Sequence, residues 1–433
     1  MINKFNLTEF KKFHNSSQID GNVVGSIEGR IFRIFRKKIN IYKEAISIIH
    51  PIKSIIPTKT IFEDSESLIV EHEPLEFITY YDEWTKNQKV EAAISILKIQ
   101  KELSAHGFYL FDPHSFNITF KNAESIYFDF GSIKKGTVST STWFLKNFCG
   151  GFTKDYWDSI LNIGKIQKST IAFRLLFSSS PYDLLIKIIS RRRENILQKV
   201  ILTIVNIFPK SLKIFNLLSK KIPALNSSIT NWSEYVQKEP LLINESPRVS
   251  NFIKLITYYK PETILDIGAN KGAYSKLALK LGVKKAICAD LDENSLNILR
   301  EDVHKNQLPI WTAKLNLMEY NENPGCYGTY QPVHERLHSD FCICLAVVHH
   351  LCYFGNYSFD NVAERLNRFS DKILILEFIP YDDVHLGGAN YKGKDRTWYT
   401  AANFIKAMKF YFPKVHEIFE SDPYPRILIK FEK

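Results

Sequence analysis

Beyond residue 250, the hydrophobic pattern alternates between two periods. Short, almost purely apolar runs, as expected of strands buried on both faces, are separated by segments in which apolar residues recur at helical spacing. The runs predict strands over 263–267, 285–290, 309–315, 340–348 and 372–378. The other segments predict helices over 250–259, 275–281, 294–306 and 404–412, and a closing pair of strands over 415–419 and 426–431. This alternation is typical of an α/β fold with a doubly wound parallel sheet.

The first third of the chain has a different pattern. Alternating apolar positions predict strands over 22–24, 31–35, 68–71 and 126–130, and helical spacing predicts helices over 41–49 and 90–103. The stretch 144–218 is mostly helical in pattern, and the polar stretch 223–230 is a linker candidate. We therefore predict an α+β domain over 1–142, a helical connector over 143–227 and the α/β domain over 228–433.

The strand and turn around Asp266 contain the first candidate chemistry. Asp266 lies at the end of an apolar strand, and Gly268 and Gly272 permit backbone angles that a side chain would disfavour. The dinucleotide motif G-x-G-x-x-G is disfavoured, because two of its three glycines are missing. A second strand ends at Asp290, 24 residues further on, where an acid can hold ribose hydroxyls. S-adenosylmethionine (SAM) carries positive charge and no phosphate, so it is a ligand that two such acids can bind. The alternative is an ordinary strand and turn with a capping aspartate and no ligand.

Four sequence motifs make a family resemblance specific. They are D-I-G-A-N-K-G-A-Y-S from Asp266, A-D-L-D-E-N-S-L from Ala289, L-A-V-V-H-H-L from Leu345 and E-F-I-P-Y-D-D from Glu377. Together they resemble the class I SAM-dependent methyltransferases, and more narrowly a family of two-part bacterial proteins related to a host-specific nodulation protein. Members of that family often lie among genes for surface polysaccharide or secondary metabolism. The resemblance implies a Rossmann-like methyltransferase sheet.

The resemblance also implies which residues hold SAM. Asp266 would face its cationic part and Asp290 its ribose, and Asn316 stands where family members usually carry an aspartate near the adenine amino group. The cofactor-binding residues expected are Asp266, Gly268, Ala269, Asn270, Gly272, Tyr274, Asp290, Leu291, Asn316, Leu317 and Leu345.

The next two predicted strands end in further candidate groups. The strand over 340–348 leads to His349 and His350, either of which can act as a general base for an acceptor hydroxyl. Because they are adjacent in sequence, we expect their side chains to diverge. Glu377 ends the next strand and forms an acidic rim with Asp382 and Asp383, which could bind hydroxyls or a metal, or simply face water. We predict His349, His350 and Glu377 as catalytic residues; packing and capping roles for the histidines are the alternative.

The first domain contains a second motif. Asp112 and Asn117 are five positions apart, and Asp129-Phe130-Gly131 closes a strand twelve residues after Asn117. This spacing resembles the catalytic loop and metal-binding motif of protein-kinase-like folds, in which the first aspartate orients the accepting hydroxyl and the other two residues hold Mg²⁺. A chance helix and strand is the alternative.

Three departures from the kinase pattern imply a degenerate domain. The His-Arg pair before the first aspartate is replaced by Leu110-Phe111, the glycine motif is absent, and Arg33 stands roughly where the phosphate-binding lysine belongs. We expect Asp112, Asn117 and Asp129 to bind a metal only if this domain is active, and predict no other metal site.

The composition narrows the possible partners. The formal net charge is +11, but the basic residues are spread along the chain without interleaved aromatics, which disfavours nucleic acid. The basic stretch 191–193 adjoins apolar helical turns, which either contact an anionic membrane surface or pack between domains.

No signal peptide and no run of about 18 apolar residues is visible, so we expect a cytoplasmic protein without a membrane span. Six cysteines without a C-x-x-C motif predict free buried thiols.

These observations predict a SAM-dependent methyltransferase, and the family resemblance implies O-methylation of a carbohydrate, surface-polysaccharide or secondary-metabolite acceptor. Two alternatives remain open. One is a bifunctional kinase–methyltransferase acting on a glycan, and the other is a regulatory protein that binds SAM without transferring a methyl group. The sequence leaves the acceptor atom and the oligomeric state open.

Overall fold

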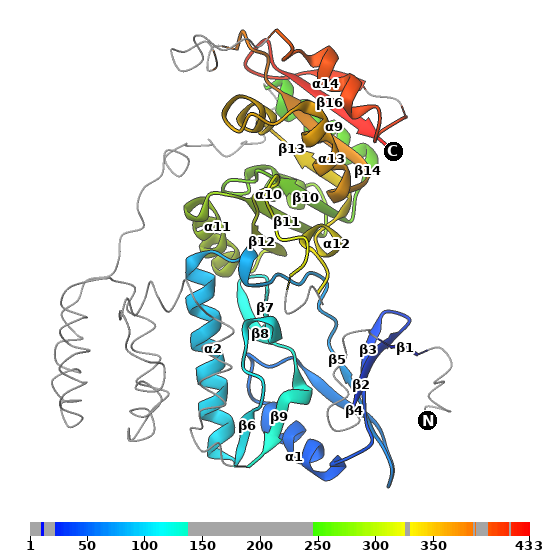
Figure 1. The fold of residues 1–433 in the computed structure, drawn as a ribbon, viewed down its shortest axis with the longest axis vertical. Coiled ribbons are helices and arrows are strands. Elements are labelled where there is room, and N and C mark those ends of the chain that lie inside the picture. Colours follow the sequence, from blue (N-terminus) through cyan, green and yellow to red (C-terminus); the bar gives the residue numbers. More distant parts are fainter. Residues whose placement is uncertain are drawn as a thin grey trace, which may run out of the picture. The chain divides into compact units, whose positions relative to one another are not determined.

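The computed structural model describes residues 10–12, 22–136, 246–324, 330–383, 386, 397–414 and 417–433 (Figure 1). The chain divides into two compact units, unit 1 (Met1–Glu76 and Lys86–Ser227) and unit 2 (Phe77–Thr85 and Ser228–Lys433). The helical connector predicted over 143–227 lies outside the described residues. Within the described part of the chain, no helix is long and apolar enough to cross a membrane.

Unit 1 contains an antiparallel sheet of five strands in the order β1-β2-β3-β5-β4. Helix α1 connects β3 to β4 and buries Tyr42, whose ring stacks on Phe35 at a centroid distance of 3.8 Å. The bounds are β1 Lys11–Lys12, β2 Val23–Ile27, β3 Arg30–Phe35, α1 Ile39–Ile49, β4 Thr58–Glu63 and β5 Leu68–His72. Strand β4 lacks a strand pattern in the sequence, because its two large apolar residues are adjacent and the other four positions are threonines and charged residues.

The rest of the described part of unit 1 consists of one long helix and two small two-stranded sheets. Helix α2 lies beside strand β6, which pairs with β9, while β7 pairs with β8. The elements are α2 Lys86–Ala105, β6 Phe108–Leu110, η4 Ser115–Asn117, β7 Ile118–Lys121, β8 Glu124–Tyr127, η5 Phe130–Ser132 and β9 Ile133–Lys135. Turn η4 ends at Asn117 and leads directly into β7, and turn η5, which follows Asp129, leads directly into β9.

Unit 2 contains a sheet of seven strands in the order β12-β11-β10-β13-β14-β16-β15. The first five are parallel, and β16 and β15 form an antiparallel closing pair. The strands are β10 Thr263–Ile267, β11 Lys285–Asp290, β12 Ile310–Lys314, β13 Ser339–Cys344, β14 Ser370–Phe378, β15 Glu417–Glu420 and β16 Ile427–Glu432. The predicted α/β fold with a parallel Rossmann-like sheet and a closing strand pair is therefore confirmed.

Helices connect the parallel strands, and several begin at a side-chain cap. Ser246, Asp292, Ser358 and Thr400 each accept a hydrogen bond from a backbone N–H of the first turn, which favours helix initiation. The helices are α9 Pro247–Tyr259, α10 Ala273–Lys280, α11 Glu293–Asn306, α12 Val333–Arg336, α13 Phe359–Phe369 and α14 Ala401–Met408. Helices α13 and α14 pack together and add their apolar faces to the core of the sheet.

A short segment from the first part of the chain belongs to unit 2. Phe77 packs edge-on against Trp311 of the edge strand β12, with ring centroids 5.1 Å apart. The carboxylate of Glu83 pairs with the guanidinium of Arg336, whose Nη1 lies 3.0 Å from Oε2, and the ring of Tyr80 lies 4.1 Å from the guanidinium carbon. Both charged side chains are buried, at 5% and 9% exposure. The segment is therefore held against strand β12 and helix α12.

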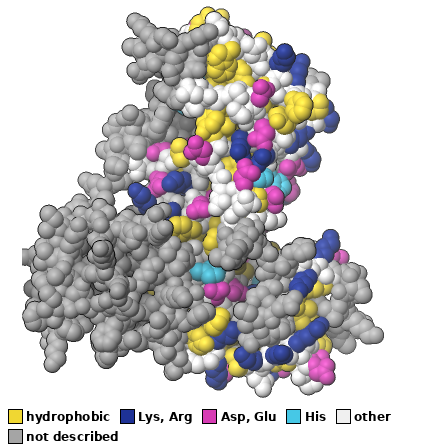
Figure 2. All heavy atoms as spheres, in the orientation of Figure 1, with side chains coloured by type: hydrophobic (Ala, Val, Ile, Leu, Met, Phe, Trp, Pro, Cys, Tyr) yellow, Lys and Arg dark blue, Asp and Glu magenta, His cyan; other side chains and the backbone are white. Residues whose placement is uncertain are grey.

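The described surface and the cysteines agree with the composition. In Figure 2, basic and acidic side chains are interspersed over the described part of the visible face. Cys288, Cys342, Cys344 and Cys352 are buried free thiols, as predicted, and the other two cysteines lie outside the described residues.

Candidate active site

The order in which successive strands are added to the unit 2 sheet reverses between β10 and β13. In an open α/β sheet the crevice at such a switch point, at the carboxyl ends of the strands, is the usual ligand site. The turn after β10 and the loop after β13 meet there, because a Cβ atom on Gly268 would lie 2.3 Å from Cγ2 of Val347. Gly268 also has a φ of +80°, so both the backbone angle and the close approach require glycine.

Asp266 is buried below this turn. Its side chain is 4% exposed, and Oδ2 accepts a hydrogen bond of 2.7 Å from the hydroxyl of Ser275. Burial raises the pKa of Asp266 to about 7, and the nearby charge of Asp290 acts in the same direction. None of the described residues gives Asp266 a cationic hydrogen-bond partner, so its carboxylate is close to the point of protonation at neutral pH.

Asp290 is held close to the same turn. One carboxylate oxygen accepts the backbone N–H of Asn270 at 2.7 Å, and the other accepts that of Asp292 at 2.8 Å. Burial raises its pKa, which these backbone hydrogen bonds oppose. Asn270 has a φ of +50°, a conformation that asparagine tolerates better than most residues. The next residue, Leu291, is 57% exposed, so an apolar side chain stands open beside this acid.

The remaining predicted cofactor residues frame the same edge. Gly272 has a φ of +69°, and a Cβ atom there would lie 2.9 Å from the side chain of Leu299. Asn316 uses its side chain locally, accepting the N–H of Met318 at 3.2 Å. Ala269, Tyr274 and Leu317 are buried, and Leu345 is half-buried at the end of β13.

His349 and His350 lie on a helical turn rather than at the end of a strand. Strand β13 ends at Cys344, and a short π-helix spans His350–Phe354. The expectation of divergent side chains was wrong, because the two imidazole centroids are 3.8 Å apart. Burial lowers the pKa of His349 to about 2 and that of His350 to about 4, so both rings are neutral at pH 7. Nδ1 of His349 is buried and has no hydrogen-bond partner among the residues that the structure describes.

Glu377 is placed at the end of β14 as predicted, but its carboxylate is fully buried. Nη1 of Arg248 lies 3.3 Å from both carboxylate oxygens, and the hydroxyl of Ser421 donates to Oε1 at 2.5 Å. Sequence patterns missed Arg248 and Ser421, since they lie 129 and 44 positions away from Glu377. These partners occupy the carboxylate of Glu377, so in this conformation it is already neutralised inside the protein.

The predicted acidic rim separates into two environments. Asp382 is exposed, while Asp383 is fully buried and pairs with Arg426, whose Nε lies 2.8 Å from Oδ2. Both members of this pair act on the charge of His349, because Asp383 raises and Arg426 lowers its pKa. The pair therefore lies near the histidines, and only Asp382 offers an open carboxylate.

Two of the three polar residues predicted in unit 1, Asp112 and Asn117, are in contact, while the third, Asp129, pairs with an arginine. The side-chain amide of Asn117 donates to the carbonyl of Asp112 at 2.9 Å, and the Tyr127 hydroxyl donates to the same carbonyl at 3.0 Å. Asp129 pairs with Arg33, whose Nη2 lies 2.8 Å from Oδ1. The Arg33 side chain is 9% exposed, and its guanidinium supplies the counter-charge of the Asp129 carboxylate.

Arg33 is built into its surroundings. A Cβ atom on Gly131 would lie 1.8 Å from Nη1 of Arg33, so the glycine that follows Asp129 and Phe130 makes room for the guanidinium. Nη1 also donates to the side-chain carbonyl of Asn22 at 3.1 Å. Strand β3, the Asp129 turn and the start of β2 are therefore joined through one buried arginine.

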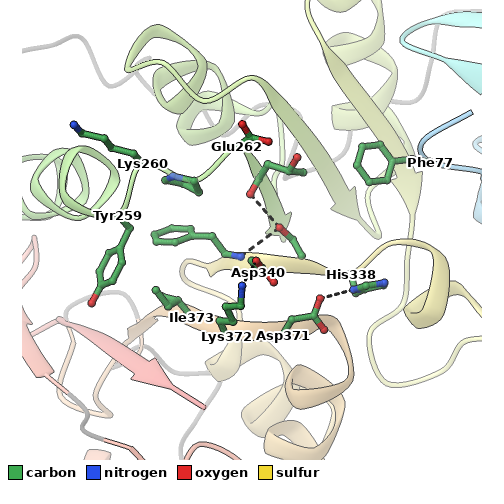
Figure 3. A pocket seen from close by; sticks show the side chains of 13 residues that line it. Phe77, Tyr259, Lys260, Glu262, His338, Asp340, Asp371, Lys372 and Ile373 are labelled. Atoms are coloured by element: carbon green, nitrogen blue, oxygen red, sulfur yellow. Dashed lines mark hydrogen bonds and ion pairs between the residues drawn. The ribbon is translucent and has the colours of Figure 1, made fainter. Parts of the chain in front are cut away.

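A pocket of about 600 Å³ lies at the opposite edge of the unit 2 sheet, at the amino ends of β10, β13 and β14 (Figure 3). Figure 3 shows His338 directed at Asp371, with which it forms a hydrogen bond. Lys372 pairs with Asp340 at 2.5 Å. These charged side chains satisfy one another, and the pocket is separate from the predicted cofactor residues.

No known family model matches the chain. The chain is 24% identical over 357 residues to nodulation protein NoeA of Rhizobium meliloti (strain 1021), covering 75% of this chain and 73% of that protein.

Solved structures similar to the chain include methyltransferases. One is magnesium protoporphyrin IX methyltransferase from Synechocystis PCC 6803 with bound SAH, at 14% identity and a TM-score of 0.33, covering 53% of this chain and 99% of that one. Another is an O-methyltransferase family protein from Burkholderia thailandensis, at 13% identity and a TM-score of 0.31, covering 43% of this chain and 55% of that one. The match thus spans about half the length of the second protein.

Proposed function

We propose that unit 2 is a SAM-dependent methyltransferase whose cofactor site is the carboxyl edge of its parallel sheet. The observation that carries this proposal is Asp266, a buried carboxylate with a pKa of about 7 and a neutral hydrogen-bond partner. Such a group gains most from a ligand that brings its own positive charge. The sequence similarity to NoeA supports the wider resemblance that first suggested this function.

The residues at this edge suit SAM. Asp266 would face the cationic part of the cofactor, Asp290 the ribose hydroxyls and Leu291 the adenine ring, while the carbonyl of Asn316 would accept from the adenine amino group. The exposed apolar side chain of Leu291 and the tight turn at Gly268 support this assignment. When bound, the cofactor supplies an electrophilic methyl group.

The histidine pair would activate the acceptor. His349 and His350 are neutral at pH 7 because burial lowers the pKa of each, so either ring has a nitrogen lone pair that can accept the hydrogen of an attacking hydroxyl. The same burial makes both rings weaker bases than a free imidazole. Nδ1 of His349 has no partner within the described residues and is therefore the stronger candidate for the base. Holding the hydroxyl next to this nitrogen would replace a bimolecular encounter with a positioned one.

The acceptor we propose is a carbohydrate, a surface polysaccharide or a secondary metabolite, methylated on oxygen in the cytoplasm. The family resemblance suggests this class, and the similarity to a nodulation protein supports it. Glu377 keeps its predicted place among the catalytic candidates only if the acceptor displaces Arg248 or Ser421 from its carboxylate.

For unit 1 we propose a kinase-like domain that recognises a partner and does not transfer phosphate. The hydrogen bond from Asn117 to the carbonyl of Asp112 supports the resemblance to a kinase catalytic loop. The pairing of Asp129 with Arg33 argues against a metal at Asp129, because an arginine stays charged at every pH of interest. A bifunctional kinase–methyltransferase is the second candidate, and it requires that pair to open.

The experiment is a methyl-transfer assay on the full chain with methyl-labelled SAM, using extracted bacterial glycans as acceptors. We expect transfer by the wild type. His349→Ala should lower kcat about a hundredfold while the Kd of SAM changes less than threefold, since a general base contributes roughly 10²–10⁴ to the rate. SAM binding without transfer to any acceptor, unchanged by the variant, would favour a SAM-binding regulatory protein.

A further inference from the structure

Two short turns at the carboxyl edge of the unit 2 sheet have the same construction. In the first, Pro380 to Asp383, the N–H of Asp383 donates to the carbonyl of Pro380 at 3.1 Å. In the second, Pro423 to Arg426, the N–H of Arg426 donates to the carbonyl of Pro423 at 3.1 Å. Each turn therefore begins with proline, has a tyrosine second and ends with a charged residue.

The charged residues that end the two turns, Asp383 and Arg426, form an ion pair with each other. Nε of Arg426 lies 2.8 Å from Oδ2 of Asp383, and Nη2 lies 3.3 Å from Oδ1. The side chains of this pair are 7% and 0% exposed. The turns leave neighbouring strands, since Phe378 of β14 is opposite Ile427 of β16. A two-pronged buried ion pair holds its partners in one orientation, so the turns are presented as a unit.

Further contacts fix the second turn. The hydroxyl of Ser421 donates to Glu377 at 2.5 Å. The side chain of Asp422 accepts the backbone N–H of Arg248 at 3.0 Å at the start of helix α9. The residues before the second turn are thus tied to both β14 and α9.

These anchored turns expose two aromatic rings. Tyr381 is 62% exposed and Tyr424 is 90% exposed. Asp382, between Tyr381 and the buried Asp383, is also exposed. Large exposed aromatic side chains on firmly held loops are typical of binding surfaces, because a tyrosine supplies contact area at a low cost in conformational entropy.

The turns lie at the carboxyl edge of the sheet, the edge to which the proposed cofactor residues belong, because the first follows β14 and the second precedes its antiparallel neighbour β16. Both charges of the Asp383–Arg426 pair also act on the imidazole of His349. A ligand lying on the tyrosines would therefore be bound at the same edge as the proposed methyl donor.

We infer that Tyr381 and Tyr424 form an acceptor-binding surface for a neutral carbohydrate; this inference rests on the proposed methyltransferase function. A sugar ring has an apolar C–H face that packs on an aromatic ring, and hydroxyls at its edge that donate to a carboxylate such as that of Asp382. Both rings are open to solvent, which suits a ligand that is itself well hydrated. The exposed negative charge of Asp382 and the neutral histidines favour an uncharged sugar over a polyanion.

The test is binding of the full chain to an array of neutral oligosaccharides in saturating S-adenosylhomocysteine (SAH), with SAH affinity measured on the same samples by calorimetry. We expect the wild type to bind at least one oligosaccharide. Tyr381→Ala and Tyr424→Ala should each weaken that binding about three- to tenfold, because a ring contact is worth about that factor. Tyr381→Phe and Tyr424→Phe keep the ring face and should stay within about twofold.

Tyr258→Ala is the matched control. Tyr258 is 79% exposed but lies near the last residue of helix α9, and the amino ends of the strands flank the next residue, Tyr259. We expect this variant to bind oligosaccharide and SAH like the wild type.

Three outcomes would overturn the inference. They are SAH binding with no oligosaccharide bound, equal oligosaccharide binding by wild type and a Tyr381→Ala, Tyr424→Ala double variant, or an equal loss in Tyr258→Ala. A folded protein that binds no SAH would overturn the proposed function and this inference together, which distinguishes the two failures.

Discussion

The acids of the two units differ in what neutralises them. In unit 1, Asp129 meets the guanidinium of Arg33 at 2.8 Å, so the protein supplies the counter-charge itself. In unit 2, Asp266 is more deeply buried, and its hydrogen-bond partner is the neutral Ser275. Burial therefore raises the pKa of Asp266 to about 7.

The two acids differ in whether the protein itself supplies a cation to the carboxylate. A carboxylate that already has an internal cation gains little from a metal or a cationic ligand, whereas a buried carboxylate without one gains a great deal. By this criterion the contrast supports the proposal that unit 2 is the ligand-binding unit. Glu377, which pairs with Arg248, belongs with Asp129 rather than with Asp266.

The largest expected effect comes from removing the unpaired charge. Asp266→Asn keeps the shape of the side chain but cannot ionise, and we expect it to weaken SAM binding about a hundredfold, measured by calorimetry at pH 8. A charged hydrogen-bonded contact in a buried site is worth roughly 2–5 kcal/mol, which supports that magnitude. Asp302→Asn, which alters an acid already paired with Lys276, is the control and should bind like the wild type. Equal affinities for all three proteins would remove Asp266 from the cofactor site.

The next effect should appear in unit 1 as lost stability rather than lost binding. Arg33→Met leaves Asp129 without its counter-charge, and we expect the local free energy of unfolding to fall by about 2 kcal/mol. Hydrogen exchange of peptides from β3 and β5 would measure it. Lys43→Met breaks an exposed pair with Glu63 and should cost less than about 1 kcal/mol. Equal costs for both variants would show that the part-buried Arg33–Asp129 pair has no special role.

The affinity for SAM should also depend on pH. The pKa of Asp266 is raised to about 7, so below that pH its carboxyl is mostly protonated and cannot pair with a cation. SAM affinity should therefore rise about tenfold from pH 6 to pH 8, in line with the fraction ionised. Protonation of SAM itself affects both proteins equally, so its effect cancels in the ratio of the wild-type affinity to the Asp266→Asn affinity. A ratio that is constant with pH contradicts the raised pKa.

The smallest expected effect is that of Glu377→Gln on cofactor binding. Arg248 already neutralises this carboxylate, so SAM affinity should change less than about threefold. The same variant tests the predicted catalytic role, because a fall in kcat with unchanged SAM affinity would place Glu377 at the acceptor. A large fall in SAM affinity would instead place it with Asp266.

Local patterns were sufficient for most of the unit 2 sheet. The prediction over 285–290 coincides with β11, because an apolar run between turn residues is a short-range signal. The strand predicted over 340–348 ends early at Cys344, since Ala346 turns the chain with a φ of +55°. Val347 then packs against Gly268 instead of a neighbouring strand. The apolar run alone does not reveal that change of partner.

The site divides in the same way. Asp266 and Asp290 could be predicted because each ends a strand within a recognisable motif. The partners of Glu377 and Asp383 could not, because Arg248 and Arg426 reach them across long sequence separations that only the folded chain brings together. The contact between Glu83 and Arg336 likewise joins residues 253 positions apart.

The most direct test of the account is a pair of calorimetric titrations of the wild-type full chain, one with SAM and one with ATP and Mg²⁺. The account predicts saturable heat with SAM and none with ATP and Mg²⁺, because Asp266 lacks a cation and Asp129 has one. Heat with ATP and Mg²⁺ but none with SAM would contradict it, and would make unit 1 the ligand-binding unit.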